Sequence, residues 1–288
     1  MDRITPEPRR HTLRQAAEDA RYSKEVVPTP QTADPAYRLA FQDLDFLLRE
    51  DLRPVRLQLE LLKPELLLAE AGIVSTFVFY GSARIPSAAE AENRVAEAAD
   101  PARRKVAERL AAKARFYEEA RRLAFLASSA PCRGDGGRDF VVCSGGGPSI
   151  MEAANRGAAD AGAPSIGLNV VLPHEQKPND WVTPHLSFQF HYFAIRKMHF
   201  LMRAKAVAVF PGGFGTLDEL FELLTLIQTK KMAPVPILLF GRDYWNRIVN
   251  FEALAEEGVI DPADLSLFTM VETAEEAWAA VCAASRAG

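Results

Sequence analysis

The sequence predicts an α/β fold built on a parallel, doubly wound sheet, preceded by an N-terminal helical extension. After Gly72, short apolar segments alternate with longer helical patterns, which is typical of a parallel sheet covered by helices. The 288 residues are 48% hydrophobic and 25% charged, which is ordinary for a globular protein with one large domain and an appendage. We therefore divide the chain into an extension, residues 1–72, and a main domain, residues 73–288.

The extension is expected to be mostly helical. Residues 1–34 are rich in Pro, Arg and Glu, and we expect them to be loosely ordered, with a short helix over 13–22. Over residues 35–71 apolar side chains recur at three- and four-residue spacing, which predicts helix. We expect this segment to pack on the main domain or on a second copy of the chain.

The main domain is predicted to contain six strands and six helices. The strands are expected at residues 73–81, 139–144, 165–171, 205–210, 235–240 and 268–271. The helices are expected at residues 88–127, 148–162, 193–204, 216–229, 243–256 and 274–285, with a glycine-rich loop over 131–138 and another loop after 171. In such a sheet, ligands bind at the carboxyl ends of the strands.

Composition excludes several classes of function. The net charge of −4 gives no reason to expect binding to nucleic acid or to an anionic membrane. No apolar run approaches the roughly 20 residues of a membrane-spanning helix, and the polar N-terminus lacks the apolar segment of a signal peptide. Cys132, Cys143 and Cys282 have no metal-binding spacing. We therefore expect a cytoplasmic protein without a metal.

Three of the predicted strands end in glycine-containing loops, at residues 80–84, 144–149 and 211–216. Glycine at a strand-to-helix turn often only relieves backbone strain, but three such loops would converge on one edge of the sheet. The second loop is a poor dinucleotide fingerprint, because Ile150 occupies the third glycine position and no acidic residue follows about 20 residues later. No Gly-Lys-Ser/Thr sequence marks an ATPase loop.

The third loop has the character of an anion site. Backbone N–H groups from Gly213 to Leu217 would point out of a helix N-terminus, and the hydroxyl of Thr216 could add a further donor. Glu219 follows within one turn, where it could act as a general base. The same residue also completes a Thr-x-x-Glu capping box with Thr216, so a structural role stays open.

The helix predicted at 193–204 supplies a cation for this carboxylate. Arg196, His199 and Arg203 share one face by their spacing. Arg196 near the site would keep Glu219 ionised, whereas the alternative is that Arg196 and Lys197 form a solvated basic face. His191 and His199 rank below the Arg/Glu pair as acid–base candidates.

These motifs together resemble one known family. PGGFGTLDE, residues 211–219, fits the PGGxGTxxE signature, with Arg196-Lys197 upstream and YGSAR and GGGPSIMEAANRGA in the two earlier loops. Over residues 73–256 the chain resembles the LOG ("lonely guy") family of cytokinin-activating phosphoribohydrolases, often mislabelled as lysine decarboxylases. Its length is more similar to that of the longer bacterial members.

The resemblance implies a Rossmann-like fold and a homodimer or higher homo-oligomer that uses no organic cofactor. It implies hydrolysis of the N-glycosidic bond of AMP or of cytokinin riboside 5′-monophosphates, giving the free base and ribose 5-phosphate. By the same resemblance, Arg196 and Glu219 are the catalytic pair. The residues expected to bind the substrate are Ser82, Gly146, Glu152, Lys197, Gly212, Gly213, Gly215 and Thr216. Ser149 departs from the pattern, because relatives commonly carry glycine there, and its side chain is expected to narrow the pocket.

Two other functions stay open at this point. A non-catalytic carrier of a nucleotide or of a phosphate-containing cofactor, such as molybdenum cofactor, would use similar loops but would not need both Arg196 and Glu219. An oligomeric scaffold would need neither. A decarboxylase would need a lysine that binds pyridoxal phosphate, and nothing distinguishes Lys197 or Lys205 for that role.

Overall fold

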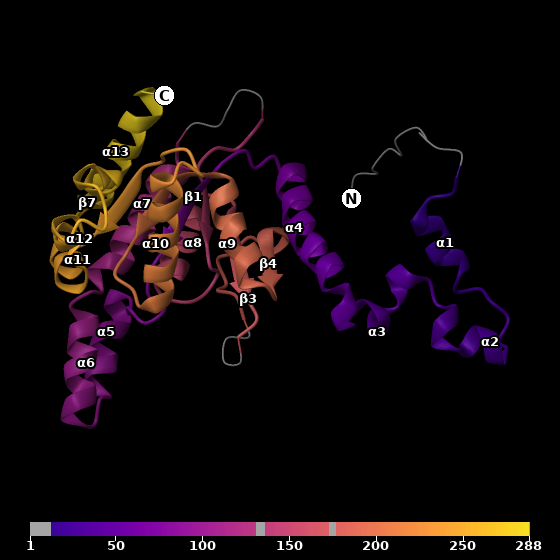
Figure 1. The fold of residues 1–288 in the computed structure, drawn as a ribbon. Helices are drawn as coiled ribbons and strands as arrows, with labels where there is room; N and C mark the ends of the chain where they lie inside the picture. The colour runs from indigo at the N-terminus through magenta and orange to yellow at the C-terminus, as the bar shows by residue number, and fades with distance from the viewer. Residues whose placement is uncertain (1–12, 131–135, 173–176, 288) are drawn as a thin grey trace. The chain divides into compact units, whose positions relative to one another are not determined.

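The computed structural model describes residues 13–130, 136–172 and 177–287. Its contacts divide the chain into two compact units, Met1–Leu59 and Glu60–Gly288 (Figure 1), and we describe each unit by itself. Cys132, most of the expected loop at 131–138 and the start of the N-terminal segment lie outside the described residues. The functional division of the chain at 72/73 stays a prediction.

The first unit consists of short helical segments. They are α1 (Ala16–Tyr22), α2 (Pro30–Ala33), η1 (Pro35–Tyr37), η2 (Ala40–Gln42), α3 (Leu44–Leu47), η3 (Glu50–Leu52) and the first part of α4 (Arg53–Glu70). The helix expected near 13–22 is confirmed, but the continuous helical pattern expected from residue 35 is wrong up to residue 52. The side chains of Asp34 and Asp43 accept backbone N–H groups of Ala36 and Phe46, and such local bonds favour separate short turns over one helix.

The second unit is built on a seven-stranded sheet in which every pairing is parallel. Its strands are β1 (Thr76–Tyr80), β2 (Val141–Ser144), β3 (Ser165–Val170), β4 (Ser187–Phe190), β5 (Ala204–Val209), β6 (Ile237–Phe240) and β7 (Thr269–Val271), in the order β4-β3-β2-β1-β5-β6-β7. The predicted α/β class with a doubly wound parallel sheet is confirmed. Strand β4 was expected as loop, because four residues at a sheet edge give little periodic signal.

Helices connect the strands and cover both faces of the sheet. They are α5 (Ala88–Ala96), α6 (Pro101–Ala111), α7 (Arg115–Ser128), α8 (Ile150–Asp160), α9 (Phe193–Met202), α10 (Phe214–Gln228), α11 (Arg242–Ile248), α12 (Phe251–Glu256) and α13 (Ala274–Ala287), with 3₁₀ turns η4 (Pro184–Leu186) and η5 (Pro262–Leu267). None of the helices in the described ranges is long and apolar enough to cross a bilayer.

Two helices that the sequence predicted as continuous are interrupted. The segment 88–127 forms three helices. The break before α6 arises because Asp100 caps that helix by accepting the N–H groups of Ala102 and Arg103, and Pro101 occupies the first helical position. Helix α7 begins after Ala114 without a side-chain cap. The segment 243–256 forms two, since Asn250 caps α12 through the N–H of Ala253. At Asp100 and at Asn250, a polar N-cap residue within a helical pattern therefore marks the start of a new helix.

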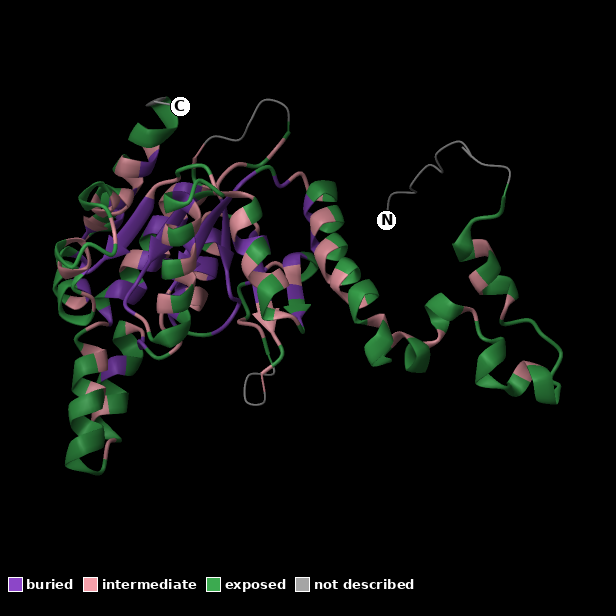
Figure 2. Cartoon of the chain, viewed as in Figure 1, coloured by how far each residue is buried: buried purple, intermediate pink, exposed green. Residues whose placement is uncertain are grey.

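The core lies in two layers, one on each face of the sheet. Alternate residues of β1 point to opposite faces, so Phe77 and Phe79 pack with α7, α8 and α13, whereas Val78 and Tyr80 pack with α9, α10 and α11. Figure 2 shows the strands of the sheet as buried, with exposed residues on the outer surfaces of the helices. Fixed on both faces, the strands hold their C-terminal loops in place.

The chain reverses its direction of winding between β1 and β5. From β1 it proceeds through β2 and β3 to β4 at one edge, and it then returns to place β5 on the other side of β1. The loops that follow β1 and β5 therefore leave the sheet at a topological switch point, which is the usual place for a ligand in an open α/β sheet.

Candidate active site

A cavity of about 660 Å³ lies at the switch point. Its walls are the loop after β1, the loop after β5 with the first turn of α10, and single side chains from neighbouring helices. Seven of the predicted site residues line it: Ser82, Arg196, Gly212, Gly213, Gly215, Thr216 and Glu219. The structure thus brings the first and third glycine loops to one place, as the convergence of parallel strands requires.

The start of α10 offers unpaired backbone donors to this cavity. Gly213 is the N-cap, and the first helical hydrogen bond runs from the N–H of Leu217 to the carbonyl of Gly213 at 3.0 Å. The three N–H groups before Leu217 precede this bond and have no partner within the helix. A Cβ atom added at Gly213 or Gly215 would meet nothing within 4 Å, so the backbone there is accessible. With the helix dipole, this end suits an anion such as phosphate.

The capping box considered for Glu219 is not formed. Helix α10 begins two residues before Thr216, whose side chain turns back over Gly212: a Cβ atom on Gly212 would lie 2.1 Å from the Thr216 Oγ1. The N-cap Gly213 has no side chain with which to cap the helix. The helix was expected to begin at Thr216 but begins at Phe214. The expected start was too late because Phe214 and Gly215 follow the glycine pair and have the character of a loop.

Glu219 instead pairs with Arg196. The Arg196 Nη1 lies 3.6 Å from the Glu219 Oε1, and the two side chains are only 12% and 14% exposed. The Arg196 Nε also donates to the Leu168 carbonyl at 2.7 Å, and its guanidinium lies 5.0 Å from the ring centroid of Phe200. These contacts fix the guanidinium beside the carboxylate, so the alternative of a solvated basic face is wrong for Arg196.

The surroundings of Glu219 raise its pKa to about 7. Burial is the largest cause, and the charge of Arg196 opposes it without cancelling it. Asp218 and Glu222 raise this pKa further, whereas Lys197 lowers it. A carboxyl group with a pKa near neutrality exchanges a proton readily at physiological pH, which suits acid–base catalysis.

Lys197 bridges α9 and α10. Its Nζ lies 3.0 Å from the Asp218 Oδ2 and 3.2 Å from the Glu222 Oε2, and it does not line the cavity at the switch point. The ammonium group of Lys197 therefore balances the charges of Asp218 and Glu222, the two carboxylates that flank Glu219 on α10. The predicted contact between Lys197 and substrate stays a prediction.

The second glycine loop is held by a buried hydrogen-bond network that the sequence did not reveal. Asn155 of α8 is fully buried, and its carboxamide oxygen accepts hydrogen bonds from Ser144 Oγ at 2.8 Å and from Asn179 Nδ2 at 2.9 Å. The N–H of Asn179 donates to the carbonyl of Gly146 at 2.8 Å. The one sequence signal for this role of Asn155 is a polar residue on the apolar face of α8.

Two predicted substrate contacts in this region have other partners. Gly146 adopts φ +72°, and its N–H donates to Ser144 Oγ at 3.0 Å. Glu152 accepts a hydrogen bond from the Tyr117 hydroxyl at 3.2 Å. Neither residue lines the cavity at the switch point, and their contacts with substrate stay predictions.

Ser149 does not narrow this cavity. It is the N-cap of α8, so that helix begins at Ile150 rather than at Pro148, and its Oγ is buried and donates to the carbonyl of Ile85. Its φ of +66° explains why glycine suits the position, because side chains are disfavoured in this region. The departure from the family pattern is therefore a matter of backbone conformation.

Replacing Ser149 by alanine should lower the free energy of unfolding by about 1–2 kcal/mol, because the buried hydrogen bond is lost and the positive φ remains. The glycine variant should be more stable than the alanine variant by about 1 kcal/mol, since glycine relieves the strain. Urea unfolding of the two variants measures the difference. Equal stability of the two would contradict this account of the turn.

The histidines of this region have structural partners. The His199 ring is buried, with its Nε2 3.3 Å from the Glu60 carbonyl, and Arg203 pairs with Glu65 of α4. The backbone N–H groups of His191 and Tyr192 donate to the Glu60 carboxylate. His199 and Arg203 therefore face α4, and neither lines the cavity at the switch point.

Comparison with known proteins agrees with the motifs. The family model described as "Possible lysine decarboxylase" matches residues 151–281. The probable cytokinin riboside 5′-monophosphate phosphoribohydrolase LOG4 of Oryza sativa subsp. japonica is 28% identical over 139 residues, which are 47% of this chain and 59% of that protein. The cytokinin riboside 5′-monophosphate phosphoribohydrolase LOG3 of Arabidopsis thaliana is 28% identical over 140 residues, which are 47% of this chain and 63% of that protein. The chain thus spans about three-fifths of the length of these relatives.

Solved structures give weaker likenesses. The molybdenum cofactor binding protein of Rippkaea orientalis is 17% identical, with a TM-score of 0.42 over 73% of this chain and 96% of that one. The Moco carrier protein of Chlamydomonas reinhardtii is 19% identical, with a TM-score of 0.39 over 72% and 95% of the two chains. Together, the family model and the curated relatives confirm the resemblance of this chain to the LOG phosphoribohydrolase family.

Proposed function

We propose that the protein hydrolyses the N-glycosidic bond of a nucleoside 5′-monophosphate, AMP or a cytokinin riboside 5′-monophosphate, and releases the base and ribose 5-phosphate. One observation carries the proposal: the free N–H groups at the start of α10 and the Arg196–Glu219 pair line the same cavity. Thr216 and Glu219 are three residues apart, which is about 4.5 Å along a helix axis. A phosphate at the helix start therefore leaves the attached ribose close to the carboxylate.

The chemistry of this bond suits the pair. The C1′–N bond breaks with its electron pair leaving to the base, so positive charge develops on the ribose, and a nearby carboxylate stabilises that charge. Ionised Glu219 also accepts a proton from the water whose oxygen bonds to C1′, and overall that proton ends on the departing base. Arg196 fixes the carboxylate through the contacts described above.

The carrier hypothesis is not favoured. The relatives are named as phosphoribohydrolases, and a carrier has no use for a buried carboxylate whose pKa burial raises to about 7 beside a phosphate site. The names of the relatives and the acid–base character of Glu219 support the enzyme.

The test is to incubate the purified chain with AMP and to separate the products by chromatography. We expect adenine and ribose 5-phosphate to appear in equal amounts. No release from AMP, from a cytokinin riboside monophosphate or from any other purine or pyrimidine monophosphate would contradict the proposed function.

Replacing Gly215 by alanine should weaken the binding of ribose 5-phosphate about tenfold or more without unfolding the protein. The added methyl group meets no protein atom within 4 Å, but it occupies the side of α10 at which the phosphate would reach the N–H groups. Alanine is also the better helix former, so thermal stability should rise slightly. Calorimetric titration with ribose 5-phosphate measures the effect, and an unchanged affinity would place the phosphate elsewhere.

A further inference from the structure

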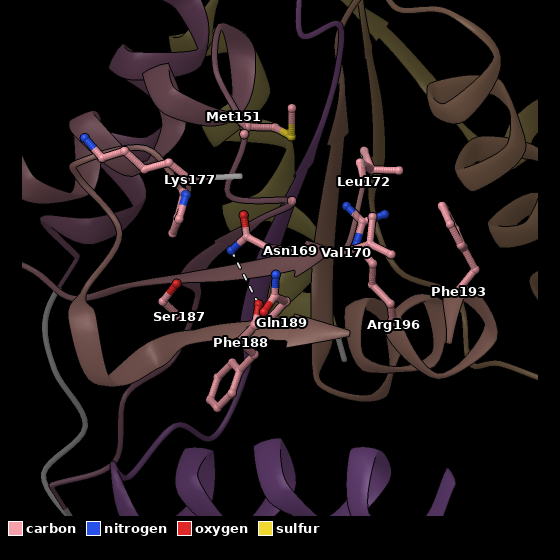
Figure 3. A pocket seen from close by; sticks show the side chains of 13 residues that line it. Met151, Asn169, Val170, Leu172, Lys177, Ser187, Phe188, Gln189, Phe193 and Arg196 are labelled. Atoms are coloured by element: carbon pink, nitrogen blue, oxygen red, sulfur yellow. Dashed lines mark hydrogen bonds between the residues drawn. The ribbon is translucent and has the colours of Figure 1, made fainter. Parts of the chain in front are cut away.

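A second cavity, of about 360 Å³, adjoins the first. It lies over the ends of β3 and β4 and beside α9, and Gly145 and Gly147 of the second glycine loop line it (Figure 3). Arg196 and Met151 line both cavities. A ligand that extends past Arg196 from the start of α10 would therefore enter the second cavity.

The walls of the second cavity are not those of an anion site. Its two cations already have partners: the Lys177 Nζ lies 2.6 Å from the Asp180 Oδ1, and Arg196 pairs with Glu219 and the Leu168 carbonyl. The side chains of Met151 and Phe193 give it apolar surface, and Phe193 is half-exposed. Apolar walls with uncharged polar groups suit a flat neutral ring.

Two carboxamides supply those polar groups. Asn169 of β3 and Gln189 of β4 are partners in the register of the two strands, so they lie side by side on one face of the sheet. The Asn169 Nδ2 donates to the Phe188 carbonyl at 3.4 Å, as the dashed line in Figure 3 shows. The Oδ1 of Asn169 is therefore left as an acceptor. The backbone of Gln189 belongs to the β3–β4 ladder, whereas its side chain is exposed and makes no hydrogen bond to another side chain in the described part of the chain.

Gly146 makes room for this arrangement. A Cβ atom at Gly146 would lie 2.6 Å from both the Nδ2 and the Oδ1 of Asn169. The glycine thus lets the carboxamide lie against the loop backbone. This gives Gly146, predicted as a substrate-binding residue, a role in positioning Asn169.

We propose that the second cavity binds the base of the nucleotide, and that Asn169 with Gln189 selects a base that carries an exocyclic amino group, as a 6-aminopurine does. The inference rests on the proposed hydrolysis of a nucleoside monophosphate. A carboxamide bonds the amino group and ring nitrogen of adenine well, whereas a 6-oxo base would set its oxygen against the Asn169 Oδ1. With the phosphate at α10 and the base here, the glycosidic bond lies beside Arg196 and Glu219.

The test compares AMP with IMP, which differ at the exocyclic group of the base. The wild-type chain should prefer AMP, and Asn169→Leu should lower kcat/KM for AMP about tenfold or more while changing that for IMP little. Gln189→Leu, at an exposed edge position where folding is not at risk, should reduce the preference in the same direction. The proposal would be overturned if these variants lowered kcat/KM equally for AMP and IMP, or lowered it for neither.

Two controls separate this inference from the proposed reaction. Asn246 of α11 is an exposed carboxamide residue that lines a different cavity, and Asn246→Leu should leave the preference unchanged. The affinity for ribose 5-phosphate, which has no base, should be unchanged by Asn169→Leu when measured by calorimetry. A loss of this affinity as large as the loss of kcat/KM for AMP would overturn the assignment of the second cavity to the base. If no nucleotide is hydrolysed, the proposed reaction fails, but a tighter binding of AMP than IMP that Asn169→Leu abolishes still supports the base site.

Discussion

Replacing Glu219 by glutamine is expected to lower the rate of nucleotide hydrolysis by about 10²–10⁴-fold, the usual contribution of a general base. Glutamine keeps the size of the side chain, but it can neither take a proton from water nor stabilise the ribosyl cation. Burial raises the pKa of Glu219 to about 7. The activity of the wild-type enzyme should therefore increase with pH through about 7, as the carboxylate ionises.

The same substitution should change how stability depends on pH. The pKa of Glu219 is about 7 in the folded protein, above the ordinary value of 4.5, so the folded state holds the proton more tightly than the unfolded state. The stability that this gives is fully present below about pH 4.5 and is lost as pH rises through 7. Between pH 5 and 8 the wild type should lose about 2–3 kcal/mol relative to Glu219→Gln, which carries no titrating proton here.

Urea unfolding at a series of pH values, together with the AMP assay, tests both parts. Asp218→Asn is the matched control, because Asp218 precedes Glu219 on α10 but is 59% exposed and does not line the cavity. That variant should keep most of the activity. Two results would contradict the role given to Glu219: a Glu219→Gln variant that is fully active, or the same pH dependence of the free energy of unfolding in the variant and the wild type.

Much of the site could be predicted from the sequence because parallel strands impose convergence. Short apolar strands ending in glycine were recognisable at β1, β2 and β5, and their C-terminal loops must share one edge of the sheet. The pairing of Arg196 with Glu219 followed from the helix spacing and the PGGxGTxxE motif, and the structure places the two side chains together.

The remaining features depend on contacts between residues far apart in the chain. Strand β4 forms because its four residues pair with β3. Four residues are too few to show a recognisable alternation of apolar and polar side chains. Asn179 donates directly to the Gly146 carbonyl of the second glycine loop and also to Asn155, which lies 24 residues away in the sequence. Such partners leave no local pattern. The true start of α10 was also missed, because Phe214 and Gly215 have no helical signal of their own.

Replacing Arg196 by alanine is expected to be the second most damaging change, with a loss of activity of about 10²–10³-fold. The guanidinium touches Glu219, Leu168 and Phe200 and lines both cavities. Its charge lowers the pKa of Glu219, so without it the pKa should rise further, and the pH–activity profile of the residual enzyme should shift to higher pH. Lysine should not restore activity, because an ammonium group lacks the planar set of donors.

Arg203→Ala is the control for stability, since Arg203 pairs with Glu65 and does not line the cavity at the switch point. The Arg203→Ala variant should have a lower unfolding midpoint and an unshifted pH–activity profile.

The double variant Arg196→Ala/Glu219→Gln tests whether Arg196 and Glu219 act as a unit. If Arg196 acts mainly by holding Glu219 in its ionised form, the double variant should be little slower than Glu219→Gln alone, because residues that act together give non-additive losses. Additive losses would instead mean that Arg196 acts on the substrate independently of Glu219.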